Sequence, residues 1–155
     1  MATTTAPRTA EAAHVDTAQD PGFLAFFLLR TGFTVAPIAF GVDKFFNWMV
    51  EWDRYLWAEI PEALGVSAQD FMYGVGVVEI VAGLVVLFAP QIGAGLVAAW
   101  LGGIIGNLVL QGEYWDIALR DFGLMLGAIT LLLLSRKYHP LGRRNRPDMT
   151  RASRL

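Results

Sequence analysis

The sequence lacks cysteine altogether, and its two histidines, His14 and His139, both lie close to an end of the chain. The absence of cysteine excludes disulfides, thiol chemistry and iron–sulfur ligation within this chain. It also excludes a membrane bundle of the vitamin K epoxide reductase type, which works through a Cys-x-x-Cys pair. Neither histidine is placed to hold haem inside a membrane. We therefore expect no metal site and no covalently attached cofactor.

Charged residues are also scarce, at 17% of the chain, whereas 55% of residues are hydrophobic and the mean hydropathy is +0.46. The formal net charge of −2 gives no reason to expect a nucleic-acid partner. About 20 apolar residues in a helix cross the roughly 30 Å of bilayer hydrocarbon. Runs of this kind occupy about residues 22–42, 71–89, 92–110 and 117–134. The sequence thus predicts an all-α, integral membrane four-helix bundle that lies in the lipid bilayer.

The predicted organisation is a disordered tail at residues 1–21, a four-span domain at 22–135 and a basic tail at 136–155. Seven of the twelve basic residues follow Ser135. Basic flanks favour the cytoplasmic side, and an even number of spans returns the chain to the side on which it began. We expect a multi-pass protein of the cell membrane with both termini in the cytoplasm and the acidic loops 43–70 and 111–116 outside.

The first of these loops carries apolar side chains at helical spacing: Phe45, Trp48, Met49, Trp52 and Leu56. This pattern is typical of a short amphipathic helix in the membrane interface, which we expect Pro61 to end. Two interpretations stay open for this helix. It either anchors the protein in the interface or forms a lid or docking surface over the mouth of the bundle.

Small and polar residues recur at three- and four-residue steps on the first two spans. One stripe contains Arg30, Thr34, Pro37, Gly41 and Lys44, and the other Tyr73, Gly76, Glu79, Gly83 and Val86. Such stripes are expected to face the bundle interior. Gly102-x-x-x-Gly106 and Gly123-x-x-x-Gly127 predict close backbone contacts in the last two spans.

Charges at membrane depth are costly, so they are usually paired and often functional. Counting about 1.5 Å per residue, Arg30 lies about 12 Å from the inner end of its span and Glu79 about 12 Å from the outer end. Across roughly 30 Å of hydrocarbon the two backbones then differ by about 6 Å in height, and we expect a buried Arg30–Glu79 ion pair. The candidate ligand-binding residues are Arg30, Lys44, Glu79, Asn107, Arg120 and Asp121. They either fix the packing of the helices or form a polar pocket that binds a small amphipathic molecule or relays protons.

Several short motifs give the chain a family resemblance over about residues 23–135. They are Arg30 followed by Gly32, Gly41-x-x-Lys44-Phe45, Glu79-Ile-Val-Ala-Gly83-Leu, and Ala118-Leu-Arg-Asp-Phe-Gly-Leu124 followed by Ala128. In these elements the chain resembles the DoxX family of small four-span membrane proteins. The resemblance implies a link to thiosulfate:quinone oxidoreductase, as a small subunit, or to other membrane redox complexes. Arg30, Glu79, Arg120 and Asp121 are the site positions that it carries over.

Three functions follow as expectations. The first is an accessory subunit of a membrane oxidoreductase that binds quinone or another lipid-soluble molecule, with the redox complex as its partner. The second is a proton-coupled small-molecule transporter that works as a homo-oligomer, with Glu79 as the coupling carboxylate. The third is a structural or assembly factor of a membrane complex without a small ligand. The sequence leaves open whether the protein is an enzyme.

Overall fold

The computed structural model describes residues 20–139, and its main elements are four long helices. They are α1 (Pro21–Asp43), α3 (Ala68–Phe88), α4 (Pro90–Gln111) and α5 (Trp115–Tyr138). All four are long and apolar enough to cross a membrane. The predicted all-α bundle of four spans is thereby confirmed, and the chain is a multi-pass membrane protein. The tails predicted at residues 1–21 and 136–155 fall largely outside the described residues.

The starts of these helices follow from local sequence. Asp20 accepts a hydrogen bond from the Gly22 amide at 2.9 Å, ahead of Pro21 in the first helical position of α1. Ser67 accepts from the Asp70 amide at 3.1 Å and so caps the start of α3. Pro90 opens α4 directly after Ala89, and this one-residue connection makes α3 and α4 antiparallel neighbours.

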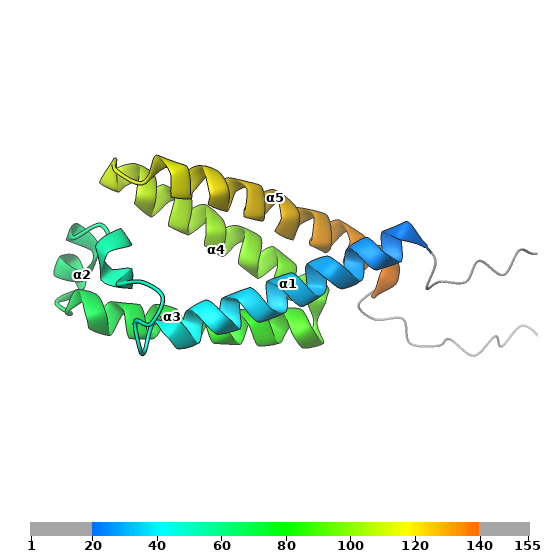
Figure 1. Ribbon diagram of the computed structural model, residues 1–155, viewed down its shortest axis with the longest axis horizontal. Helices are drawn as coiled ribbons and strands as arrows, with labels where there is room; N and C mark the ends of the chain where they lie inside the picture. The colour runs from blue at the N-terminus through cyan, green and yellow to red at the C-terminus, as the bar shows by residue number, and fades with distance from the viewer. Residues whose placement is uncertain (1–19, 140–155) are drawn as a thin grey trace, which may run out of the picture.

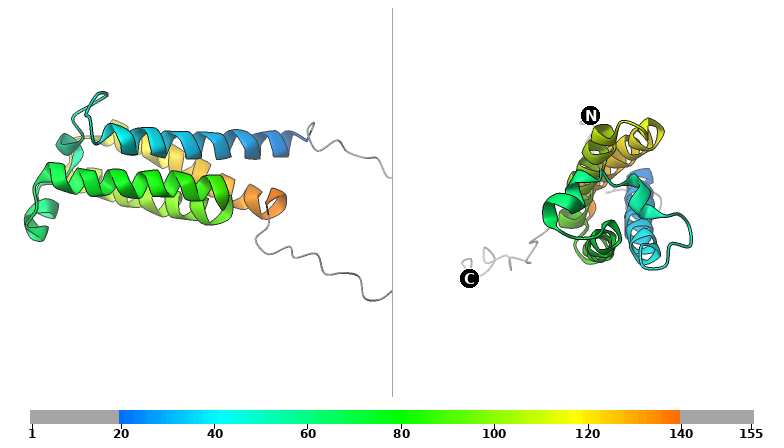
Figure 2. Two further views of the ribbon diagram at one scale, coloured as in Figure 1. Left: turned by 90° about the horizontal axis from the view of Figure 1, so that it is seen from below. Right: turned by 90° about the vertical axis from the view of Figure 1, so that its left-hand side faces the viewer.

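The helices pack as two antiparallel pairs, α1 with α3 and α4 with α5 (Figure 1). The pairs meet near the α3–α4 turn, where Gly93 lies directly against the backbone of Val86. Toward the other end their ribbons diverge, and η2 (Trp52–Tyr55) and α2 (Glu59–Leu64) lie across that end (Figure 2). The long helices themselves close the bundle at the end with the α3–α4 turn. At the opposite end the α1–α3 connection covers it.

A single apolar core joins the four helices. It consists of Phe26, Phe33, Ala82, Val86, Ala94, Val97, Ala128 and Leu131. Tyr138 at the end of α5 packs against Phe23 and Phe26 at the start of α1, with ring centroids 5.8 Å away in both cases. The two ends of the described chain thus lie at the same end of the bundle (Figure 1).

The predicted amphipathic helix over residues 45–56 does not form as one helix. Residues 45–51 are irregular, Asn47 has a φ of 51°, and the short helices η2 and α2 follow. A left-handed residue of this kind interrupts a right-handed helix. Pro61 does not end a helix either. It lies in the first turn of α2, where a missing amide costs nothing, and α2 ends at Leu64, followed by Gly65 with a φ of 68°.

The polar stripes of the first two spans do face each other, as predicted. A Cβ added to Gly41 would lie 2.6 Å from the Gly76 carbonyl oxygen, and one added to Gly83 would lie 2.8 Å from that of Thr34. These glycines bring the backbones of α1 and α3 into direct contact. The close backbone contacts expected in the later spans are not found. A Cβ at Gly106 or Gly123 would meet no neighbour within 4 Å, and one at Gly102 or Gly127 would meet side chains only, those of Met125 at 3.8 Å and Phe33 at 3.2 Å.

Candidate functional site

The centre of the candidate site is a buried ion pair between α1 and α3. The Lys44 ammonium, one residue past the end of α1, lies 2.7 Å from the Glu79 carboxylate in the middle of α3. Their side chains are only 4% and 10% exposed. The close contact between Gly41 and Gly76 lets α1 approach α3 near this point, so that the long lysine side chain spans the remaining distance. Each charge thereby compensates the other where water is largely excluded.

Trp52 closes this pair on the side of the α1–α3 connection. The Lys44 nitrogen lies 3.7 Å from the centroid of the Trp52 ring, a cation–π contact. The Trp52 indole nitrogen donates a 2.7 Å hydrogen bond to the Asp43 carboxylate. Asp43 and Lys44 therefore both hold the Trp52 side chain. Lys44 contacts the face of its ring, and Asp43 accepts a hydrogen bond from its indole nitrogen.

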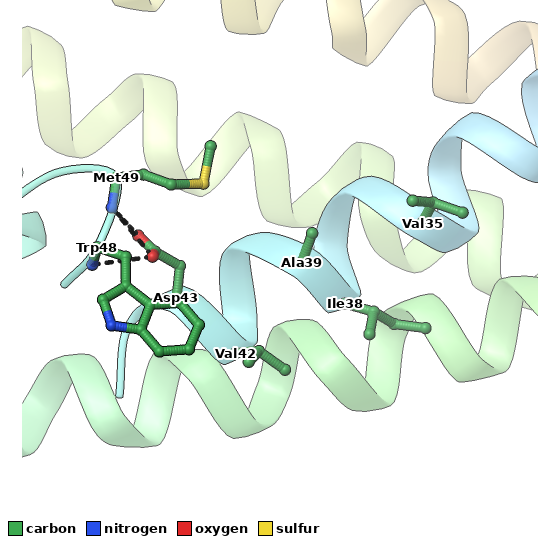
Figure 3. A pocket seen from close by; sticks show the side chains of 7 residues that line it. All are labelled: Val35, Ile38, Ala39, Val42, Asp43, Trp48 and Met49. Atoms are coloured by element: carbon green, nitrogen blue, oxygen red, sulfur yellow. Dashed lines mark hydrogen bonds between the residues drawn. The ribbon is translucent and has the colours of Figure 1, made fainter. Parts of the chain in front are cut away.

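Asp43 also shapes the irregular segment that follows α1. Its buried carboxylate accepts hydrogen bonds from the backbone amides of Trp48, at 3.0 Å, and Met49, at 3.1 Å (Figure 3). A charged acceptor with three donors is a strong local organiser of the backbone. The resulting turn covers an apolar pocket of about 390 Å³ on the outer face of α1. Besides Asp43, Trp48 and Met49, the pocket is lined by Val35, Ile38, Ala39 and Val42.

The same segment is tied to the opposite helix pair. We call residues 48–57 the strap. The Asn107 side chain of α4 donates to the Tyr55 carbonyl at 2.6 Å and accepts from the Trp57 amide at 3.0 Å. One turn later, Gln111 donates to the Arg54 carbonyl at 2.9 Å. The strap is thus bonded to α1 at its start and to α4 at its end, across the diverging helices.

Arg30 does not pair with Glu79, and this part of the predicted site is wrong. Its guanidinium donates instead to the Leu87 carbonyl, in the last turn of α3. The carbonyls of a last helical turn lack intrahelical donors and carry partial negative charge, so a cation there is favourable. The prediction assumed that the spans end at equal heights. In the fold Arg30 is level with Leu87, eight residues or about 12 Å along α3 from Glu79.

Asp121 contributes a third buried carboxylate, on α5. Its side chain is 6% exposed and lies 3.0 Å from the guanidinium of the neighbouring Arg120, which is 63% exposed. Asp121 is close enough to Glu79 to act on it electrostatically. The fold therefore brings Lys44, Glu79, Asn107 and Asp121 to the end of the bundle near the strap, whereas Arg120 points outward and Arg30 belongs to the other end.

Two functional candidates were missed by sequence reasoning. Trp52 was assigned to a helix that either anchors or covers the bundle, without a contact to the charged residues, and Trp100 on α4 was not considered. The sequence signal for Trp52 was the pair of charged residues Asp43 and Lys44 at the end of the first span. The turn after α1 decides that Trp52 is the side chain that contacts them. The buried indole nitrogen of Trp100 lies close to the Glu79 carboxylate, just outside strict hydrogen-bond geometry.

Taken over the described part of the chain, no three histidine, cysteine, aspartate or glutamate side chains gather in a way that could hold a metal ion. The chemistry on offer is a buried ammonium, three buried carboxylates and an indole N–H close to one of them. Such a set can bind and orient a polar group that enters from an apolar phase. No protein-family model, curated protein or solved structure matches the chain, so these side chains themselves are the basis for a functional conclusion.

Proposed function

We propose that this protein is a DoxX-like membrane protein of the cell membrane that binds a quinone and serves as an accessory subunit of a membrane oxidoreductase. Both termini lie in the cytoplasm in this proposal, in keeping with the basic residues after Ser135. The quinone carries the electrons, and the partner complex supplies or accepts them. The chain itself contains no cysteine that could perform redox chemistry.

The observation that carries the proposal is the buried Lys44–Glu79 pair beneath Trp52. A buried ion pair that served packing alone would stabilise the fold little more than apolar side chains of equal volume would. A quinone needs an apolar surrounding for its ring and tail and a few donors for its carbonyl oxygens. The ammonium of Lys44 is such a donor, and the Trp52 ring offers a surface for an aromatic or quinoid ring. The position near one end of the spans suits a headgroup that enters from the bilayer.

A specific observation also supports proton-coupled transport as a second candidate. Three carboxylates are buried, those of Asp43, Glu79 and Asp121, whereas Lys44 is the one buried cation among the described residues. Intramembrane carboxylates in such numbers are typical of proton relays. A four-helix chain encloses little volume, so a transporter of this kind is expected to act as a homo-oligomer, with Glu79 as the coupling group.

Native mass spectrometry of the full chain, extracted in mild detergent from its own membrane, tests these proposals together. Quinone bound to the wild type but lost in Lys44→Met supports the leading proposal. Lys137→Met is the matched control, because Lys137 is exposed and contacts Asp20, at 3.4 Å, and the Tyr138 hydroxyl, at 2.7 Å, rather than the buried pair. A preparation without quinone would refute the proposal. Proton-gradient-driven uptake by vesicles would then favour the transporter, and a stable partner complex without a ligand would favour an assembly factor.

A further inference from the structure

Arg30 is a cation within a span that no carboxylate compensates in the described part of the chain. The ion pairs found there involve three other cations, those of Lys44, Arg120 and Lys137. The one hydrogen bond of the Arg30 guanidinium within residues 20–139 goes to the Leu87 carbonyl, which carries no full charge. A charge at membrane depth is costly and is usually paired. Arg30 therefore needs an anion that residues 20–139 do not supply.

The surface of the bundle steps inward at Arg30. At the end that holds both ends of the described chain, α1 and α5 extend past the α3–α4 turn (Figure 2). Arg30 is level with this turn, about 13 Å along α1 from its start at Pro21. From the start of α1 to the start of α3 the two helices together cover about 42 Å, which matches a bilayer with its headgroup regions. With about 30 Å of hydrocarbon at its centre, Arg30 lies about 7 Å inside the hydrocarbon edge.

The Arg30 guanidinium is accessible at this step. Arg30 is half-buried, and its bond to the Leu87 carbonyl lies at an exposed position. Side chains of an α-helix lean toward its N-terminus, so Arg30 leans toward the surface at which α1 begins. The side chains of Leu24, Phe27 and Leu28, on the part of α1 that extends past the turn, are apolar and exposed. This part of α1 therefore stands among lipids, and the headgroup of a lipid beside it lies above Arg30.

We propose that the Arg30 guanidinium binds the phosphate of an anionic phospholipid, taken from the leaflet that both ends of the described chain face. A guanidinium presents paired N–H groups that match two phosphate oxygens. An arginine inside the hydrocarbon also thins the bilayer locally, which brings the phosphate down to the level of the step. The inference is independent of the proposed function, because the Lys44–Glu79 pair lies toward the other end of the bundle.

The surroundings of Arg30 suit the rest of such a lipid. On α3, Leu84 and Val81 follow Leu87 at three-residue steps toward the centre of the bilayer, and both are exposed, so they offer an apolar surface to the acyl chains. The exposed Arg136 and Lys137 lie at the end of α5, on the same side of the membrane. Basic side chains near the surface attract anionic lipids, which favours a headgroup with a net negative charge over a zwitterionic one.

Native mass spectrometry of the full chain in mild detergent, titrated with phosphatidylglycerol or with phosphatidylcholine, tests the proposal. Arg30→Gln removes the guanidinium charge, and Arg136→Gln, which removes the same charge from an exposed position at the same end of the bundle, is the matched control. The first phosphatidylglycerol should bind at least tenfold more weakly to Arg30→Gln, as expected for the loss of a hydrogen-bonded charge pair. The effect of Arg136→Gln should be several times smaller, and phosphatidylcholine should bind the wild type more weakly than phosphatidylglycerol does.

A second measurement uses the unchanged protein and therefore does not depend on the folding of a variant. In nanodiscs, a phosphatidylglycerol that carries a photoactivatable group beside its phosphate should label residues 27–33 of α1 and residues 84–92 around the α3–α4 turn. Labelling confined to other segments would refute the site. Equal losses in Arg30→Gln and Arg136→Gln would reduce the effect to general attraction by positive charge. Equal affinity for phosphatidylcholine would refute an anionic lipid, and displacement of the lipid by inorganic phosphate would show a site for a soluble anion instead.

Discussion

The ion pair between Lys44 and Glu79 predicts strongly non-additive effects on stability. Glu79→Leu leaves a buried ammonium, and Lys44→Met leaves a buried carboxylate. Since the two side chains are 4% and 10% exposed, neither charge is relieved by solvent where it stands. Removing one partner of such a pair costs about 3–5 kcal/mol. Lys44→Met is expected to be the more costly change, because it also removes the contact with the Trp52 ring, which adds about 0.5–2 kcal/mol.

The double variant Lys44→Met with Glu79→Leu has no unpaired charge and is expected to recover most of the loss, with a coupling energy of about 2 kcal/mol or more. The free energy of unfolding would be measured by SDS titration in mixed micelles for all four proteins. The cycle of Arg30→Leu with Glu79→Leu is the control, and it should be additive within about 0.5 kcal/mol. Additivity in the Lys44 cycle, or coupling in the Arg30 cycle, would refute the arrangement of α1 against α3.

Three further predictions concern other parts of the fold. Gly41→Ala places a Cβ against the Gly76 carbonyl and should lower stability by about 1–3 kcal/mol, whereas Gly32→Ala, in open space, should not; equal thermal stabilities would contradict the close helix contact. Asn107→Leu removes both bonds to the end of the strap, and hydrogen exchange should rise at residues 52–57 but not in α3, so unchanged protection would argue against this anchor. Hydrogen bonds from the Tyr138 hydroxyl and the Gly22 amide lower the pKa of Asp20, so the carboxylate stabilises the fold above its ordinary pKa and loses this effect as the pH falls through the lowered value. The difference in melting temperature between wild type and Asp20→Asn should therefore vanish in acid. A difference that persists there would contradict the stabilising role of the ionised Asp20 carboxylate.

The sequence was sufficient for the features that depend on neighbouring residues. Each span is a run of apolar residues long enough to be recognised alone, and the Ser67 cap is encoded within four positions. The facing stripes of α1 and α3 were also predictable, because helical spacing puts Gly41 and Gly76 on polar or small faces that must both turn inward.

Features that depend on the relative height of two helices were not predictable. The partner of Glu79 is decided by how far α1 slides along α3, and that position is set by contacts distant in sequence, such as Gly41 with Gly76 and Tyr138 with Phe23. The irregular strap has the same origin. Its apolar spacing favours a helix, but bonds to Asn107, about 50 positions away, hold its backbone in another shape.

The strap is held mainly through its backbone, so substitutions of its exposed side chains and loss of its attachment have different effects. Asp43 and Asn107 bind mainly backbone amides and carbonyls of the strap, which every residue except proline provides in full. The side chains of Trp48 and Met49 play no part in this attachment, and they are 77% and 62% exposed. Substitutions at these two positions can therefore change the walls of the apolar pocket beside α1 while the strap stays in place, so the chemistry of that pocket and the integrity of the bundle can be altered independently.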